Sequence, residues 1–329
     1  MRKIRYREAL REALREEMLQ DPNVFVIGED VGRYGGAYAV TQGLLNEFGP
    51  KRIIDAPMSE AMIVGAALGA AVAGGRPVAE IMYADFLPLA MDQIVNQAAK
   101  VHCMFGGQLA APMVIRTQQG IGRGAGPQHS QSLEAWFAHV PGLKVVIPST
   151  PHDAKGLLKT AIRDNNPVVF IEHKGLYAIE GEVPEEDYAI PMGVADVKHV
   201  GDDITIITYS HMVHVALEAA RRLSEMGISA EVVDVRTLSP LDVDTLTASV
   251  AKTRRAVVVH EACLFGGFGA EIVAQLSSRL FGKLAAPLRR VAGLDVPLPA
   301  NSRLEKLVVP SAQQIAEAAQ EMLGVPMQG

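Results

Sequence analysis

The sequence contains little cysteine, few aromatic residues and no apolar run long enough to span a membrane. Its two cysteines, Cys103 and Cys263, lie far apart and form neither a disulfide framework nor a metal-ligand spacing. Aromatic residues make up only 5% of the chain, which argues against an all-β sandwich. The Ala-rich run at 61–73 is too short to cross a membrane, and the basic N-terminus leads into no apolar signal core. We therefore expect a cytoplasmic protein.

The net charge and the lack of phosphate-binding motifs argue against several further classes of protein. The formal net charge is -6, so we expect neither nucleic acid nor an anionic membrane surface as a partner. No G-x-x-x-x-G-K-[ST] pattern occurs. The glycine-rich stretch 118–130, Q-Q-G-I-G-R-G-A-G-P-Q-H-S, matches a dinucleotide fingerprint only weakly, because no acid stands about 20 residues further on at a strand end. These observations argue against a nicotinamide-dependent dehydrogenase.

The alternation of apolar strands and amphipathic helices defines the fold class. The chain has 329 residues, too many for one typical core, so two domains are expected. Continuous apolar strands such as 24–27 and 168–171 alternate with amphipathic helices such as 6–19. This pattern predicts a doubly wound, mostly parallel α/β sheet over 1–180, a polar, helix-poor linker over 181–200 and a second α/β domain over 201–329.

One predicted helix carries an acid at its start and has no polar face. It follows a short apolar run, begins after Ser59, which we expect to be its N-cap, and ends at Gly74-Gly75. Because no face is polar, we expect the helix to be buried on all sides. Glu60 in its first turn either complements the helix dipole or, if desolvated, has a raised pKa and shares a proton with a ligand. The helix alone leaves both interpretations open.

Four side chains fall just after a predicted strand or at the start of the helix that follows it. They are Glu29, Glu60, Phe86 and His129. In a parallel sheet such positions lie along the carboxyl edge, where ligands bind. Taken singly, Phe86 also suits a core position and His129 a surface position. Together they suit a flat heteroaromatic ring, with an acid on a ring nitrogen, an aromatic side chain stacked on the ring and a histidine that handles protons.

Seven motifs, in matching order within residues 4–325, resemble the β subunit of thiamine diphosphate-dependent 2-oxo acid dehydrogenase E1 components. They are G-E-D-V-G (28–32), D-A-P-M-S-E (55–60), Y-A-D-F (83–86), D-Q-I-V-N-Q-A-A-K (92–100), Q-H-S-Q (128–131), I-R-D-N-N-P-V (162–168) and V-R-T-L-S-P-L-D (235–242). The chain is similar to the pyruvate dehydrogenase and acetoin dehydrogenase types, and 172–177, 181–186 and 188–191 lean toward the acetoin type. The resemblance implies a pyrimidine-binding, transketolase-like domain followed by a C-terminal transketolase-type α/β domain.

The resemblance also implies roles for the four side chains. Glu60 matches the glutamate that bonds N1′ of the aminopyrimidine of thiamine diphosphate and favours the imino tautomer, whose 4′-nitrogen removes the thiazolium C2 proton. Phe86 matches the aromatic residue that packs on the pyrimidine, and Glu29 matches a second acid near that ring. His129 matches the histidine that faces the acyl intermediate and the incoming lipoyl group.

A cation site and a missing motif complete what the resemblance implies. Asp164 and Asn166 match a turn that, with main-chain carbonyls near Met113 and Ala161, binds a structural potassium ion in the family. The family holds the cofactor's diphosphate through Mg²⁺ bound to a G-D-G…N motif on the α subunit, and no Gly-Asp-Gly occurs here. The chain is therefore expected to hold half of a site, completed by an E1 α subunit in an α₂β₂ heterotetramer.

The implied function is that of an E1 β subunit in a multienzyme complex. With the α subunit it decarboxylates pyruvate, or cleaves acetoin, and passes the acyl group to a lipoyl-bearing E2 acyltransferase. Three alternatives stay open: a branched-chain 2-oxo acid E1 β subunit, an assembly subunit that mainly docks the E2 core, and a transketolase-like sugar enzyme split into chains. The lack of a cluster of basic sugar-phosphate ligands argues against the last one.

Overall fold

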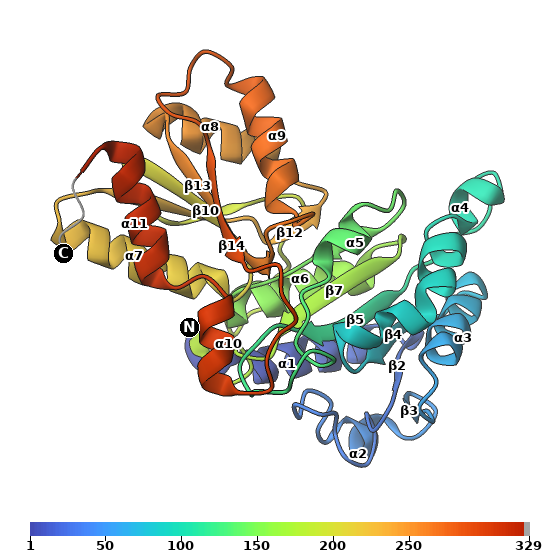
Figure 1. Cartoon of the computed structure of the whole chain (residues 1–329). Coiled ribbons are helices and arrows are strands. Elements are labelled where there is room, and N and C mark those ends of the chain that lie inside the picture. Colours follow the sequence, from blue (N-terminus) through green and yellow to red (C-terminus); the bar gives the residue numbers. More distant parts are fainter. Residues whose placement is uncertain (326–329) are drawn as a thin grey trace. The chain divides into compact units, whose positions relative to one another are not determined.

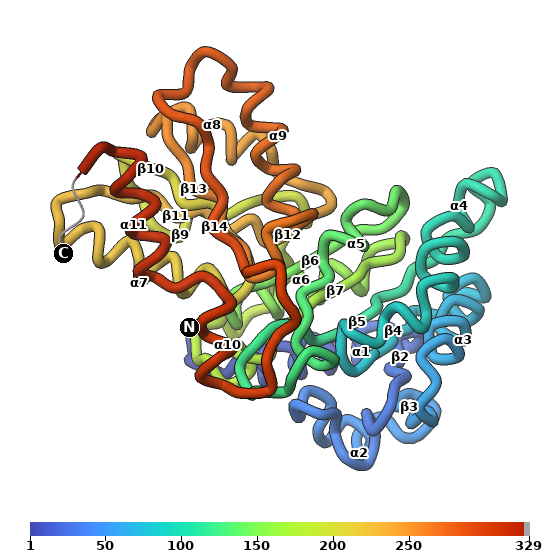
Figure 2. The backbone as a smooth tube through the Cα atoms, viewed as in Figure 1, coloured from blue at the N-terminus to red at the C-terminus, as the bar shows by residue number. Residues whose placement is uncertain are grey.

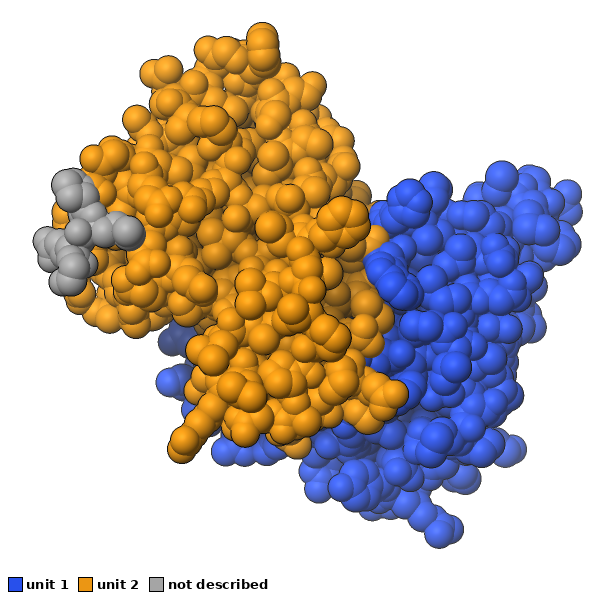
Figure 3. Space-filling view, viewed as in Figure 1, with its two compact units in different colours: residues 1–119, 136–192 blue, residues 120–135, 193–329 orange. Residues whose placement is uncertain are grey.

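The computed structural model describes residues 1–325, which divide into two compact units (Figures 1 and 3). Unit 1 comprises residues 1–119 and 136–192, and unit 2 comprises residues 120–135 and the chain from 193 onward. By packing, the segment 120–135 therefore belongs with the C-terminal half of the chain. The segment 181–200, expected as a linker, contains the strand Asp196–His199 (β9) and most of Glu180–Val183 (β8).

Unit 1 is built on a parallel sheet. Its strands lie in the order β6-β7-β5-β4-β2-β3, and neighbouring strands in this series pair in parallel. The strands are Lys144–Val146 (β6), Val168–His173 (β7), Val114–Gln119 (β5), Arg76–Ile81 (β4), Val24–Gly28 (β2) and Ile53–Asp55 (β3). A separate ribbon joins β1 (Arg2–Arg5) to β8 in antiparallel pairing. Parallel pairing requires crossover connections, as the alternating pattern predicted.

Helices cover both faces of this sheet. Helix α1 (Tyr6–Gln20) packs on α6 (Pro151–Arg163), and both share a buried cluster with Val26 and Val78. The next residues along these strands, Ile27 and Ala79, are buried on the opposite face, because side chains alternate along a strand. The remaining helical elements of this half are α2 (Leu44–Phe48), α3 (Glu60–Val72), η1 (Ala84–Ala90), η2 (Asp92–Ala98), α4 (Val101–Met104) and α5 (Glu134–Ala138).

Helix α3 is not buried on all sides, so that prediction is wrong for the single chain. It packs against β4, η1 and η2. Its buried residues are Ile63, Val64, Ala67 and Ala71. Met62 is 40% exposed, and Ala66 and Gly69 are exposed as well, so an apolar stripe faces outward. The Ser59 side chain makes no capping hydrogen bond, although Ser59 is the residue before the first turn. Only one face of the helix meets the sheet of its own chain.

Unit 2 is a second α/β layer structure, as predicted. Its sheet has the order β14-β13-β10-β11-β9, and only β9 runs antiparallel to its neighbour. The other strands are Arg289–Gly293 (β14), Ala256–Cys263 (β13), Ile204–Thr208 (β10) and Ala230–Asp234 (β11), and the short Thr237–Ser239 (β12) follows β11. Helices α7 (Met212–Glu225) and α11 (Ala312–Leu323) lie on one face, and α8 (Val243–Thr253) and α9 (Gly269–Arg279) lie on the other (Figures 1 and 2).

A short helix, α10 (Ser302–Val308), precedes α11. The buried face of α11 contributes Ile315, Ala316 and Ala319 to a core shared with α7 and the central strands. Among the helices of residues 1–325, none combines the length and the apolar character that a membrane crossing requires.

Candidate functional site

Three of the predicted site residues follow neighbouring strands at the carboxyl edge of the unit 1 sheet. Strand β2 pairs in parallel with β3 on one side and with β4 on the other. Glu29 directly follows β2, Glu60 opens α3 after β3, and Phe86 lies in η1 after β4. Helix α3 packs against η1, so the elements that carry Glu60 and Phe86 are neighbours. The edge thus offers two acids and an aromatic ring from adjacent elements, as a parallel sheet predicts.

The Glu60 carboxylate lies close enough to Glu29 to act on the protonation of Glu29. Burial raises the pKa of the Glu29 carboxyl, and the charges of Asp30 and Glu60 raise it further. Both glutamates are half-buried, so Glu60 is only partly desolvated in the single chain. A partly desolvated carboxyl beside other carboxylates, such as that of Glu29, favours retaining its proton. A shared proton is what an acid needs to donate a hydrogen bond to a ring nitrogen.

The loop that carries Glu29 is held by side-chain bonds to its backbone. Asp55 accepts hydrogen bonds from the N–H groups of Gly32 (2.6 Å) and Arg33 (3.3 Å). The hydroxyl of Thr41 donates to the carbonyl of Val31 at 2.6 Å. Asp55, at the start of the D-A-P-M-S-E motif, therefore has a structural role at this edge.

His129 lies in unit 2, whereas the other three residues lie in unit 1. It is half-buried, and its backbone N–H donates to the carbonyl of Gly126 at 3.3 Å. The same segment borders a hollow of about 420 Å³ within unit 2, lined by Pro127 and by residues 131–133, 261–263 and 293–298 among others. Three of the four residues thus share one sheet edge, and the fourth is placed by contacts within the other unit.

A buried ionic cluster crosses the same strands, and the sequence analysis did not predict it. The fully buried Arg116 of β5 donates from Nη1 to Oε2 of Glu80 on β4 (2.6 Å) and from Nη2 to Oε2 of Glu172 on β7 (3.0 Å). Gln118 also donates to Glu80 at 3.3 Å, and the Tyr177 hydroxyl donates to Glu172. The available signal was a charged residue inside each of three buried strands: Glu80 in β4, Arg116 in β5 and Glu172 in β7.

In this cluster two carboxylates share one guanidinium, and all three side chains are buried. Burial raises the pKa of Glu172, Arg116 opposes the rise, and Glu80 adds to it. Burial also raises the pKa of the Tyr177 hydroxyl, which keeps it a hydrogen-bond donor. A Cβ on Gly36 would lie 3.5 Å from Oε1 of Glu80, so the loop after Glu29 closes over the cluster. The cluster forms a rigid support next to the edge that carries Glu29.

In the turn predicted to bind potassium, the Asp164 carboxylate is already paired with the side chain of Lys144. Asn166 donates two hydrogen bonds of 2.8 Å to Oδ1 of Asp164, and Lys144 forms an ion pair with Oδ2. Burial opposes ionisation, but the bonds from Lys144 and Asn166 hold the pKa of Asp164 below its ordinary value. The carboxylate is therefore charged and already partly neutralised.

A second cation reaches the same turn. Arg76 donates to the carbonyl of Asp164 at 3.1 Å, next to the buried Ala161 at the end of α6. The carbonyl of Met113 accepts from the N–H of Val168 at 3.0 Å. The oxygens of the turn have the hard-donor chemistry that suits potassium, and Lys144 and Arg76 already satisfy part of them.

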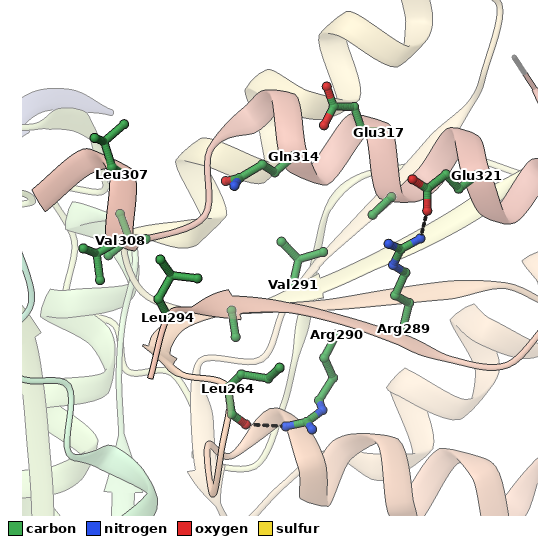
Figure 4. A pocket seen from close by; sticks show the side chains of 13 residues that line it. Leu264, Arg289, Arg290, Val291, Leu294, Leu307, Val308, Gln314, Glu317 and Glu321 are labelled. Carbon is green, nitrogen blue, oxygen red and sulfur yellow. Dashed lines mark hydrogen bonds and ion pairs between the residues drawn. The ribbon is translucent and has the colours of Figure 1, made fainter. Parts of the chain in front are cut away.

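A further hollow, of about 270 Å³, lies between β14 and α11 in unit 2 (Figure 4). Arg289 forms an ion pair with Glu321 across it, and Arg290 donates to the carbonyl of Leu264 at 2.7 Å. None of the predicted site residues lines this hollow. It is therefore distinct from the candidate site.

Each half of the chain matches a known protein family. Residues 2–180 match the family described as transketolase, pyrimidine binding domain, and residues 193–315 match transketolase, C-terminal domain. A solved chain titled "Split gene transketolase, inactive beta4 tetramer" superposes with a TM-score of 0.82 at 24% identity, covering 98% of this chain and 100% of that one. The predicted transketolase-like fold is confirmed.

Curated relatives are similar over nearly the whole chain. Identity is 50% to the acetoin:2,6-dichlorophenolindophenol oxidoreductase subunit beta of Cupriavidus necator, over 98% of both chains. It is 49% to a pyruvate dehydrogenase E1 component subunit beta of Rickettsia felis, over 97% of this chain and 98% of that one. It is 46% to the 2-oxoisovalerate dehydrogenase subunit beta of Bacillus subtilis, over 96% and 98%.

Proposed function

Because the chain belongs to the family of 2-oxo acid dehydrogenase E1 β subunits, we propose that it acts with an α subunit on thiamine diphosphate. The pair decarboxylates pyruvate, or cleaves acetoin, and transfers the acyl group to a lipoyl-bearing E2. The observation that carries this proposal is the pair of interacting acids, Glu29 and Glu60, beside the element that bears Phe86. A branched-chain 2-oxo acid is the second substrate candidate, favoured by the Bacillus subtilis relative.

In this proposal the chain's residues bind and protonate one end of the cofactor. When bound, thiamine diphosphate would supply the nucleophilic thiazolium carbon of the reaction. Glu60 holds a hydrogen bond to N1′ of the pyrimidine, which makes the exocyclic nitrogen basic. Glu29, whose pKa is raised, provides a second acid that retains its proton near that ring. Phe86 packs on the ring face. His129 serves the transfer of the acyl group to the lipoyl arm.

The exposed apolar stripe on α3 is evidence that a partner chain binds there. Met58 is 75% exposed and Leu89 is 60% exposed, and they add to the exposed apolar surface around Met62. Apolar side chains exposed on α3, on the residue before its cap and on the adjacent η1 are unfavourable in water and favour a contact with another chain. We propose that the E1 α subunit of an α₂β₂ assembly covers these side chains and supplies Mg²⁺ for the diphosphate. A transketolase-type sugar enzyme is the less favoured assignment, because the relatives near 50% identity carry dehydrogenase names.

Titration calorimetry tests the shared site. We expect no measurable binding of thiamine diphosphate to the isolated chain in Mg²⁺, because no Gly-Asp-Gly motif is present to hold the metal and diphosphate. Adding the α subunit should restore binding in the micromolar range or tighter, about 8 kcal/mol or more of binding free energy. The α subunit alone is the control. Tight, Mg²⁺-dependent binding by the isolated chain would contradict the proposal.

For the Asp164 turn we propose that potassium and Lys144 compete for the same carboxylate. Exchanging KCl for choline chloride is expected to leave the melting temperature nearly unchanged, because Lys144 neutralises Asp164. In Lys144→Met the same exchange should lower it by roughly 2–4 °C, since the ion then replaces the lost cation. Lys306→Met, which removes an exposed lysine, is the control. If neither protein responds to potassium, the turn binds no ion.

We also propose a cellular location for the protein. Cys103 and Cys263 are both exposed and free thiols. Exposed free thiols suit a reducing compartment, so we propose the cytoplasm. Fractionation of cells with an antibody to the chain is the direct check.

A further inference from the structure

The glycine-rich loop directs its backbone N–H groups at two carboxylates of its own unit. The N–H groups of Gly122 (3.3 Å) and Gly124 (2.9 Å) both donate to Oε2 of Glu305 on α10. The N–H of Ile121 donates to Oε1 of Glu261 on β13 at 2.7 Å. The G-x-G-x-G spacing therefore forms an anion-binding backbone, and the anions are side chains of the protein itself.

Glu305 is unusual for a glutamate because it is only 1% exposed. Its other oxygen, Oε1, is buried and has no hydrogen-bond partner among the described residues. The N–H groups of Gly122 and Gly124 donate to its Oε2, and such bonds to an ionised acceptor are stronger than neutral ones. Removing the carboxylate leaves two backbone donors without their acceptor, which favours a different loop conformation.

Glycine is required where the loop meets the segment before α10. Gly124 has φ +64°, and a Cβ there would lie 3.0 Å from the backbone nitrogen of Ser302. A Cβ on Gly126 would lie 3.3 Å from the Cβ of Ala300. The turn from Gly126 to His129 starts directly after this contact. The backbone that carries His129 is therefore anchored three to five residues before the histidine.

We propose that Glu305, supported by Glu261, is a positioning residue for His129. Its carboxylate holds the loop so that the imidazole stays where acyl transfer needs it, and Glu305 itself touches no substrate. This inference rests on the proposed function, because it takes His129 as the group that serves the transfer to the lipoyl arm. It gives the C-terminal unit a part in catalysis besides any role in assembly.

The test uses the reconstituted α-containing enzyme and a lipoylated E2 domain as acceptor. Glu305→Ala is expected to lower kcat for acyl transfer by about 10- to 100-fold, as small displacements of catalytic groups do. Glu305→Gln keeps an acceptor oxygen and should stay within about 3-fold of wild type. In a His129→Ala background Glu305→Ala should cause no further loss, because both changes remove the same contribution. Glu271→Gln, an exposed acid of the same unit, is the matched control.

A second readout reports the loop itself. The exposed Arg123 lies between the two tethered glycines, Gly122 and Gly124. Release of the tether should therefore speed tryptic cleavage of the peptide bond after Arg123. Mass spectrometry of the cleavage products measures this rate. If Glu305→Ala fails to fold, Gly124→Ala displaces the same loop and carries the same expectations. Additive losses in the double variant, or unchanged cleavage at Arg123, overturn the positioning role. Full acyl transfer by His129→Ala alone overturns both this inference and the proposed role of His129, whereas cofactor binding by the assembled enzyme is tested separately.

Discussion

Glu60→Gln is expected to reduce turnover of the reconstituted enzyme by at least about 100-fold, in line with the usual loss of a general acid–base group. Glutamine cannot hold the proton that the carboxyl shares with the pyrimidine ring. The substitution keeps the size of the side chain at the start of α3, so folding and assembly should persist. Dye-linked oxidation of pyruvate and of acetoin measures turnover, and size-exclusion chromatography measures assembly.

The control for Glu60→Gln is Glu186→Gln, an exposed acid of the same unit. It should leave turnover unchanged. Loss of the Glu60 charge also removes an interaction with the helix dipole, worth roughly 0.3–1 kcal/mol. If the variant shows only such a small change in stability and retains full turnover, Glu60 is an ordinary first-turn acid. The chain would then be an assembly subunit.

Arg116→Met is expected to destabilise the folded chain by about 3–5 kcal/mol, because it leaves two buried carboxylates without their cation. Arg116 is fully buried between Glu80 and Glu172. The midpoint of urea unfolding, followed by circular dichroism, measures the change. Arg221→Met removes an exposed arginine paired with Glu218 and is the matched control, with little change expected.

A triple replacement separates lost charge balance from lost packing. When Glu80, Arg116 and Glu172 are all changed to Met, no unpaired charge stays buried, so the triple variant should be more stable than Arg116→Met alone. Unfolding midpoints compare the two variants. Equal stability of Arg116→Met and wild type would show that the guanidinium does not balance these carboxylates.

The stability of Arg116→Met should also depend on pH in a defined direction. Burial already raises the pKa of Glu172 in the wild type, and Arg116 opposes that rise. Without Arg116 the folded-state pKa rises further. A carboxyl whose pKa is raised by folding adds stability below its unfolded pKa and loses it as pH rises through the folded pKa. The variant should therefore recover part of its stability on mild acidification, and the wild type should recover less.

The sequence predicted the α/β architecture because the pattern behind it is local. Helix α1 was expected over 6–19 and is present as Tyr6–Gln20, since its apolar stripe alone specifies a helix face. Glu29, Glu60 and Phe86 were expected at one edge because each follows a strand, and parallel pairing brings strand ends together. Their roles toward the cofactor stay predictions.

The sequence alone determined the alternation of strands and helices, the ordered motifs and the acid at the start of α3, because all of these are set by neighbouring residues. Tertiary structure decided what depends on pairing across the chain. Parallel register sets Glu80 opposite Arg116 and Gln118 opposite Glu172, which builds the buried cluster. Packing left one face of α3 exposed and bound the loop of His129 to Glu305, a residue far away in sequence. Such contacts follow from the register and packing of distant segments, which no local pattern encodes.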